Sequence, residues 1–206
     1  MSSKIIIIDY GMGNLSSVKR KLSRIKVDAL ITSNPHDVLT ADKIILPGVG
    51  HFQMAMENIM RLNLLDVLNE AVLIKHKPIL GICLGMQLMA NKSEEGNVPG
   101  LGWIDGDVVR FKVSNTQTYK IPHMGWNQIE IAKESPLMID IPAFSEFYFV
   151  HSYHFKTNHT EDILNETDYD YKFVSAIEKN NIFGVQYHPE KSHDVGETLL
   201  KNFCIL

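Results

Sequence analysis

The run Lys77-Pro78-Ile79-Leu80-Gly81-Ile82-Cys83-Leu84-Gly85-Met86-Gln87 contains the clearest structural signal in the chain. A short apolar run that follows a proline is typical of a buried strand, and residues 84–91 have the apolar spacing of a helix. Glycines on both sides of Cys83 leave room for a sharp strand-to-helix turn. We therefore expect Cys83 at the N-terminus of a helix, where free N–H groups and the helix dipole favour a thiolate.

A buried cysteine that only fills space at a strand end is an equally good interpretation of Cys83 taken alone. The later run Gln186-Tyr187-His188-Pro189-Glu190 changes this balance. Residues two apart on an extended segment point to the same side, and Pro189 biases His188 toward that conformation. A thiol, an imidazole base and a carboxylate that orients the base make up a complete nucleophilic set.

Strand and helix patterns alternate along the first half of the chain. Strands are predicted at residues 4–9, 27–32, 42–46 and 78–82, and helices at residues 14–26 and 51–75, with a break near Asn63. Shorter β-rich runs follow at residues 108–113, 128–132, 147–150, 172–177 and 182–187. The pattern predicts an α/β fold with a mainly parallel central sheet flanked by helices, a smaller β-rich portion in the second half, and one domain over residues 1–206.

Composition narrows the class of protein. The 206 residues carry a net charge of −4 without a basic block, which argues against nucleic acid or an anionic membrane as the main partner. The N-terminal run of four isoleucines is too short for a signal sequence or a membrane span. Two cysteines far apart, Cys83 and Cys204, favour a reducing compartment, so we expect a cytoplasmic enzyme.

Cofactor and metal motifs are weak. Gly11 and Gly13 begin a dinucleotide-like pattern, but Ser16 occupies the third glycine position. His151 and His154 lack a third ligand nearby, so we expect no metal and no cofactor. We interpret four histidines as structural or surface residues, namely His51, His151, His154 and His193.

Several motifs together carry a family resemblance. They are Ile5-Ile6-Ile7-Ile8-Asp9-Tyr10-Gly11-Met12-Gly13-Asn14, Pro47-Gly48-Val49-Gly50, His123-Met124-Gly125-Trp126-Asn127 and Tyr148-Phe149-Val150-His151-Ser152-Tyr153, besides the Cys83 and His188 runs. With these motifs the chain resembles the class I, triad-type glutamine amidotransferases, which have a flavodoxin-like fold. Within that class it resembles the HisH glutaminase subunits of imidazole glycerol phosphate synthase.

The resemblance implies roles for individual residues. Cys83, His188 and Glu190 match the catalytic triad. Backbone N–H groups at Val49, next to Gly48, and at Leu84 match the oxyanion hole, although an ordinary glycine-rich turn is the simpler interpretation of that loop. Four further positions match residues that hold the glutamine substrate, Glu95 through its ammonium and Ser152 and Tyr153 through its carboxylate (Gln87, Glu95, Ser152 and Tyr153).

The resemblance also implies a partner. Met124 and Trp126 match a docking strand, although a buried tryptophan is the commoner arrangement. The partner would be a (β/α)₈ cyclase subunit in a heterodimer, which uses ammonia to make imidazole glycerol phosphate and aminoimidazole carboxamide ribotide in histidine biosynthesis. One alternative is a paralogue that supplies ammonia to a cyclase-like partner for acetamidino-sugar synthesis. A second is a non-enzymatic or protease-like member of the fold.

Overall fold

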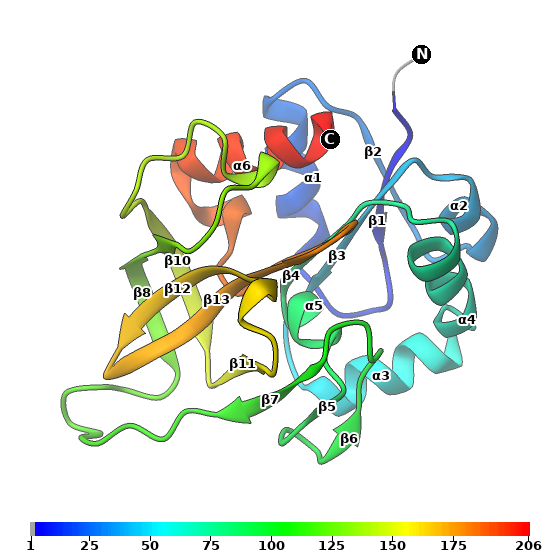
Figure 1. The fold of residues 1–206 in the computed structure, drawn as a ribbon. Coiled ribbons are helices and arrows are strands. Elements are labelled where there is room, and N and C mark those ends of the chain that lie inside the picture. The colour runs from blue at the N-terminus through cyan, green and yellow to red at the C-terminus, as the bar shows by residue number, and fades with distance from the viewer. Residues whose placement is uncertain (1–2) are drawn as a thin grey trace.

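A mixed β-sheet runs through the middle of the structure, a computed structural model that describes residues 3–206 (Figure 1). The parallel part of the sheet is ordered β2 (Ala29–Thr32), β1 (Ile5–Ile8), β3 (Lys43–Gly48), β4 (Ile79–Cys83) and β14 (Ile182–Val185). Because these strands run the same way, the carboxyl ends of β3, β4 and β14 lie at one edge of the sheet, which is where open α/β sheets bind ligands.

Mainly antiparallel strands extend the same sheet beyond β14. In order they are β13 (Tyr171–Lys179), β11 (Tyr153–Thr157), β7 (Gly106–Arg110), β5 (Lys92–Ser93) and β6 (Val98–Pro99), and only the pair of β7 with β5 is parallel. β12 (Ile163–Tyr169) pairs with β13 and with β9 (Glu130–Ile131), while β8 (His123–Gln128) and β10 (Glu146–His151) form a separate antiparallel ribbon. The predicted α/β fold with a mostly parallel central sheet is confirmed, and most of the β-rich second half continues that sheet.

Helices cover both faces of the parallel strands (Figure 1). Ile5 and Ile7 belong to the apolar cluster under α1 (Leu15–Arg24) and α6 (His193–Ile205). Ile6 and Ile8 belong to the cluster under α2 (Pro35–Thr40), α3 (Phe52–Arg61) and α4 (Leu65–Asn69). Successive strand side chains point to opposite faces, so a strand made only of isoleucines is buried on both sides.

Local signals explain where several helices begin and end. Asn14 accepts a hydrogen bond from Ser17 N at 3.3 Å and caps α1, and Asn34 does the same for His36 N at 2.9 Å before α2. The predicted break near Asn63 is confirmed, because that residue has a φ of 56° between α3 and α4. After α4 the chain continues as a π-helical turn, Glu70–Ile74.

Some predicted elements differ from the structure. The helix predicted over residues 84–91 ends early, and α5 spans only Leu84–Gln87. The carbonyls of Leu88 and Ala90 accept hydrogen bonds from Leu101 N and Gly102 N instead, at 2.8 and 3.0 Å. The strand predicted at residues 128–132 is confirmed in part: β9 lies within it, but the longer strand β8 begins five residues earlier and ends at Gln128. The prediction omitted α2, α6, β5, β6, β11 and β12.

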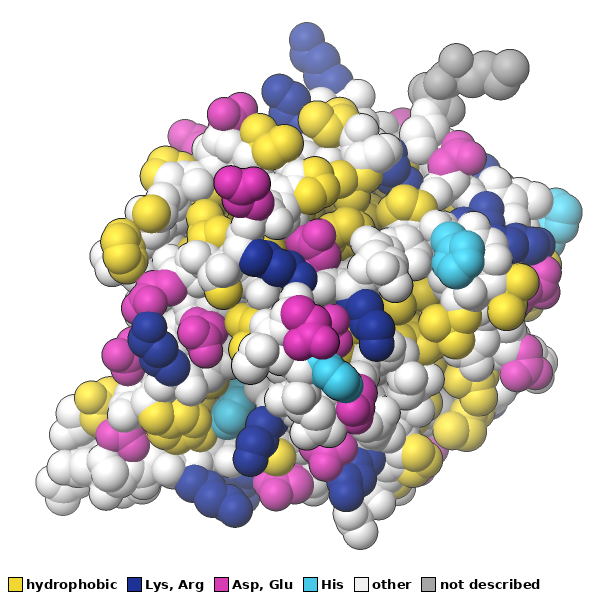
Figure 2. Space-filling model, in the orientation of Figure 1, with side chains coloured by type: hydrophobic (Ala, Val, Ile, Leu, Met, Phe, Trp, Pro, Cys, Tyr) yellow, Lys and Arg dark blue, Asp and Glu magenta, His cyan; other side chains and the backbone are white. Residues whose placement is uncertain are grey.

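The described residues show neither a patch of one charge on the face in Figure 2 nor a helix that could span a membrane. On the face shown in Figure 2, basic and acidic side chains are interspersed. Within residues 3–206, no helix combines the length and the apolar character that crossing a membrane requires. In the same part of the chain, no three His, Cys, Asp or Glu side chains gather in a way that could hold a metal ion.

Candidate active site

Cys83 occupies a strained turn between β4 and α5. Its φ of 55° and ψ of −110° lie in a region that costs a non-glycine residue on the order of 1–3 kcal/mol. Glycines make the turn fit: a Cβ on Gly85 would lie 1.7 Å from the carbonyl oxygen of Leu46, and one on Gly81 would lie 2.7 Å from the backbone of Gly85. The helix therefore sits directly against β3 and β4, and Cys83 is held at the carboxyl edge of the sheet.

His188 and Glu190 form a buried hydrogen-bonded pair. Nδ1 of His188 lies 2.7 Å from Oε1 of Glu190, and each side chain is only 2% exposed. The predicted extended geometry is wrong beyond His188, since Glu190 lies in a single 3₁₀ turn, Pro189–Lys191, that leads into α6. The turn still brings the carboxylate to the ring, so the structure brings the two side chains together by a different local route.

The backbone of His188 is fixed from two sides. Its N–H donates to Tyr148 O at 2.9 Å, and its carbonyl accepts from the Ser192 hydroxyl at 2.6 Å. The Ser192 hydroxyl oxygen also accepts from Tyr148 N at 3.0 Å, which ties the segment to β10. These contacts position the imidazole without using its ring nitrogens.

The ring of His188 is electrostatically coupled to Cys83. Burial lowers the pKa of His188. The negative charge of the Cys83 sulfur and the hydrogen bond to Glu190 raise it by more than burial lowers it, so the pKa is about 10. Nε2 of His188 has no hydrogen-bond partner among residues 3–206, so Cys83 acts on the ring as a neighbouring charge in this conformation. The charge of the sulfur and the Glu190 carboxylate therefore both favour the protonated form of the imidazole.

A cavity of about 290 Å³ opens over Cys83. It is the candidate site because Cys83 lies in its wall, whereas a larger hollow of about 590 Å³, between Ile131 and Ile139, is lined by no cysteine or histidine. The cavity brings together most of the residues that the sequence predicted to hold substrate, and its lining is Val49, Gly50, Cys83, Leu84, Gln87, Glu95, Pro122, Val150, His151, Ser152 and Tyr153.

The loop at residues 47–50 lies beside Cys83. Gly48 pairs with Cys83 in the sheet register, below the cavity rather than in its lining. A Cβ at Gly48 would lie 2.1 Å from the Tyr10 hydroxyl and 2.9 Å from Cβ of Leu84. Gly50 has a φ of 111°, which side chains other than glycine rarely adopt. Close packing and backbone freedom therefore both require glycine in this loop.

Two polar side chains of the cavity are already partly engaged. Nε2 of Gln87 donates to Tyr153 O at 3.0 Å and to Oε1 of Gln186 at 2.9 Å, which leaves the Gln87 amide oxygen as the group for a ligand. Oε2 of Glu95 accepts from Phe52 N at 2.8 Å at the start of α3. This bond orients the carboxylate at the cavity wall, where its negative charge suits an ammonium group.

Met124 and Trp126 lie on the exposed side of β8. They are 61% and 44% exposed, whereas His123 at the start of the same strand is buried. The Trp126 ring stacks on His193 with centroids 4.7 Å apart and an interplanar angle of 2°. The alternative of a buried tryptophan is therefore wrong, and the two side chains form part of an accessible apolar surface.

The structure also brings together residues that the sequence analysis did not connect. Nδ1 of His123 lies 3.0 Å from Nε2 of His151, and Nδ1 of His151 lies 2.8 Å from Tyr153 O. A carbonyl oxygen only accepts, so His151 donates from Nδ1, and its Nε2 accepts from His123. Burial lowers the pKa of His123 to about 4 and, with the added effect of His123, the pKa of His151 well below its usual value.

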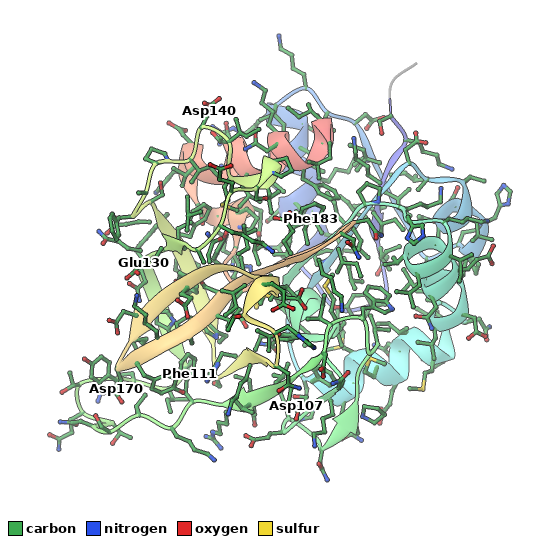
Figure 3. All side chains as sticks on the ribbon, in the orientation of Figure 1. Asp107, Phe111, Glu130, Asp140, Asp170 and Phe183 are labelled. Carbon is green, nitrogen blue, oxygen red and sulfur yellow. The ribbon has the colours of Figure 1, made fainter. Side chains whose placement is uncertain are left out.

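These two histidines come from facing positions of the β8–β10 ribbon, where His151 pairs with His123. They pack around Phe111, which is labelled in Figure 3, with ring centroids 6.2 Å and 5.2 Å from it. Only the strand pairing reveals their proximity, because the two residues lie 28 positions apart in the chain. Gln186, in contrast, stands inside the His188 motif, but its type alone gave no reason to select it.

Comparison with known proteins agrees with this geometry. The model of the family Glutamine amidotransferase class-I matches residues 6–206. The chain therefore belongs to the class I glutamine amidotransferases. Solved structures share its fold, such as a putative GMP synthase protein from Thermoplasma acidophilum, with a TM-score of 0.74, 18% identity and coverage of 99% of this chain and 93% of that one.

Within the family the chain is close to the HisH glutamine amidotransferases. It is 49% identical to imidazole glycerol phosphate synthase subunit HisH 2 of Methanococcus maripaludis, over 97% of this chain and 98% of the relative. It is 47% identical to the protein of the same name from Pseudomonas aeruginosa, over 98% of this chain and 99% of the relative.

Proposed function

We propose that residues 1–206 act as one glutaminase domain that hydrolyses glutamine to glutamate and ammonia through Cys83, His188 and Glu190. The observation that carries this proposal is the strained Cys83 turn, which faces a cavity and is coupled to the buried His188–Glu190 pair. A nucleophilic thiol, a base and an orienting carboxylate are the groups that acyl transfer from an amide requires.

The reaction proceeds in two halves. The Cys83 thiolate attacks the side-chain amide carbon of glutamine, and the carbonyl oxygen becomes an oxyanion. His188 then gives its proton to the departing nitrogen, so ammonia leaves and a γ-glutamyl thioester remains on Cys83. In the second half His188 removes a proton from water, the resulting hydroxide attacks the thioester, and glutamate and the thiolate are released. Glu190 keeps the imidazole in one orientation throughout.

The cavity residues hold and polarise the substrate. The N–H group of Leu84, at the start of α5, and that of Val49, in the loop after Gly48, are the proposed oxyanion donors. Glu95 receives the ammonium group of glutamine, the amide oxygen of Gln87 contributes an acceptor, and the N–H groups of Ser152 and Tyr153 hold the carboxylate. A carboxylate for the ammonium group and backbone N–H donors for the carboxylate together suit a zwitterionic amino acid.

The ammonia is used by a partner. We propose a heterodimer with a (β/α)₈ cyclase subunit that makes imidazole glycerol phosphate and aminoimidazole carboxamide ribotide in histidine biosynthesis, in the cytoplasm. The names of the relatives, which are subunits of imidazole glycerol phosphate synthase, support this assignment. Met124 and Trp126 are the proposed contacts, because exposed apolar side chains on a strand are suited to an interface.

The first experiment measures glutamate release by the purified chain, alone and with the histidine-pathway cyclase of the same organism and its nucleotide ligand. We expect low activity alone and a large rise with the loaded cyclase. Cys83→Ala must abolish hydrolysis while binding of the cyclase persists. No rise with a cyclase that is active on added ammonia would contradict the histidine-pathway assignment and favour a sugar pathway as acceptor.

The docking strand is tested with a matched pair of variants. Met124→Asp should weaken the heterodimer, measured by calorimetry or analytical ultracentrifugation, because it places a charge in an apolar contact. Ile74→Asp introduces the same charge at a side chain that is 72% exposed outside β8, so it should leave the affinity unchanged. Equal effects of the two changes would contradict β8 as the docking strand.

A further inference from the structure

Gln186 is a buried amide that the proposed mechanism leaves unused. It directly follows β14, it is fully buried, and Nε2 of its side chain lies 3.6 Å from the sulfur of Cys83. Its backbone N–H donates to Ser175 O at 2.8 Å, which extends the pairing of β14 with β13 by one residue. The sheet therefore fixes the point from which this side chain reaches the nucleophile.

A chain of contacts sets the orientation of the amide. Tyr153 O can only accept, so the Gln87 atom that faces it at 3.0 Å is the nitrogen. The same nitrogen of Gln87 lies 2.9 Å from the Gln186 side chain, which must present its oxygen there. The NH₂ group of Gln186 is consequently the part that faces Cys83, so the orientation follows from the network and not from the amide alone.

The chain of contacts is anchored at its far end in the ribbon. Tyr153 O also accepts from Nδ1 of His151, whose Nε2 accepts from His123. Asn127 donates to Nε2 of His123 at 3.3 Å and to Asp168 O at 2.9 Å. Every donor in this series has an acceptor. The Gln87 amide is therefore fixed by Tyr153 O on one side and by the oxygen of Gln186 on the other.

We propose that Gln186 is a catalytic residue that donates a hydrogen bond from its amide NH₂ to the Cys83 thiolate and so favours the thiolate over the thiol. This inference rests on the proposed role of Cys83 as the nucleophile. Cys83 is only 6% exposed, so its thiolate loses most of its hydration, and a neutral donor compensates for part of that loss. The amide keeps no charge of its own, so it does not compete with the proton transfer to His188.

Two substitutions of Gln186 distinguish the effect of its NH₂ donor from the effect of its size. Gln186→Glu keeps the size of the side chain and an oxygen for Gln87, but it replaces the NH₂ group with a carboxylate oxygen. Gln186→Met keeps the length and removes both polar atoms. The titratable groups near Cys83 are His188, with Glu190 behind it, Tyr10, and the cavity residues Glu95 and His151, and both substitutions leave them in place.

The experiment measures the rate at which iodoacetamide alkylates Cys83 between pH 5 and 10, followed at that residue by mass spectrometry because Cys204 is the second thiol. We expect the pH midpoint of alkylation to rise by about one pH unit in Gln186→Met, the scale of one charge-assisted hydrogen bond. Gln186→Glu should raise the midpoint further, since it places a second negative charge beside the sulfur.

An unchanged midpoint in Gln186→Met, with thermal melting curves that show folded protein, would overturn the role of Gln186, whatever the added charge does in Gln186→Glu. That result is distinguishable from failure of the proposed function, because in that case wild-type Cys83 would show no selective alkylation and Cys83→Ala would retain glutamine hydrolysis. A merely structural role of Gln186 predicts a lower melting temperature without any shift of the midpoint.

Discussion

Two buried tyrosine hydroxyl groups differ in whether they have a hydrogen-bond partner. Tyr10 and Tyr187 are both fully buried, and burial raises the pKa of each. The Tyr187 hydroxyl donates to Oδ1 of Asn165 at 2.9 Å. The Tyr10 hydroxyl lies against Gly48 and has no hydrogen-bond partner among the described residues. A buried hydroxyl without a partner reduces stability, whereas one with a partner contributes to it.

Replacing each tyrosine with phenylalanine should therefore have opposite effects. Tyr10→Phe should raise the free energy of unfolding by about 1 kcal/mol, and Tyr187→Phe should lower it by about 1–2 kcal/mol. Urea unfolding of the two variants and the wild type measures both values. Equal destabilisation by the two changes would contradict the difference in hydrogen bonding.

The chemistry of single residues was the part of the site most accessible from the sequence. The glycines around Cys83 and the proline after His188 act on the backbone of their immediate neighbours, so their effect can be derived locally. The pairing of His123 with His151 could not be derived in this way, because it depends on the register between β8 and β10. The contact of Gln186 with Cys83 likewise requires β14 to lie beside β4.

At the scale of elements, small residues decide how α5 packs against the sheet. Gly85→Ala would place a methyl group 1.7 Å from the carbonyl oxygen of Leu46. That oxygen belongs to the backbone of β3, so α5 or β3 would have to move. We expect this change to lower the free energy of unfolding by at least about 3 kcal/mol or to prevent folding. Gly102→Ala is the control: its Cβ meets nothing within 4 Å, and its φ of 67° adds only about 1–2 kcal/mol of strain.

Urea unfolding of both glycine variants, with circular dichroism to detect misfolding, gives the comparison. If the Gly85→Ala protein were as stable as the Gly102→Ala protein, the close packing of α5 against β3 would be contradicted.

The errors in predicted elements have a common physical cause. The segment after α5 shows a helical pattern, yet its carbonyls bind N–H groups of residues 101–104, which are distant in the chain. The motif that contains Trp126 forms strand β8 because it pairs with β10, and no local pattern signals that partner. For α6 a signal was available, since Leu199 and Phe203 are four residues apart and both are buried.

For the whole molecule, buried neutral histidines make stability depend on pH. His123 takes up a proton only near pH 4 in the folded state, and burial also lowers the pKa of His151 and His154. Unfolded histidines bind protons near pH 6.5, so between these limits the unfolded state holds more protons. The free energy of unfolding should therefore fall as pH falls from about 6.5 toward 4, by up to about 1.4 kcal/mol per pH unit for each such histidine.

Urea unfolding at pH 7, 6 and 5 measures this dependence. His123→Gln should reduce the slope because one of the contributing groups is gone, even if it lowers stability at pH 7. A slope between pH 6 and 5 that is the same in the variant and in the wild type would contradict the neutral state of His123.

The place of β14 in the sheet has a consequence for the order in which a ribosome-bound chain can fold. β14 is the last strand in chain order among the described residues, yet it lies in the middle of the sheet, between β4 and β13. Until residue 185 has been synthesised and has left the exit tunnel, the edge of β4 that pairs with β14 is unpaired. Over the same time, β13 and the strands beyond it are not joined to the parallel part of the sheet. His188, the proposed base, arrives later still, so with the proposed triad the nascent chain cannot begin to hydrolyse the cell's glutamine before its sheet is closed.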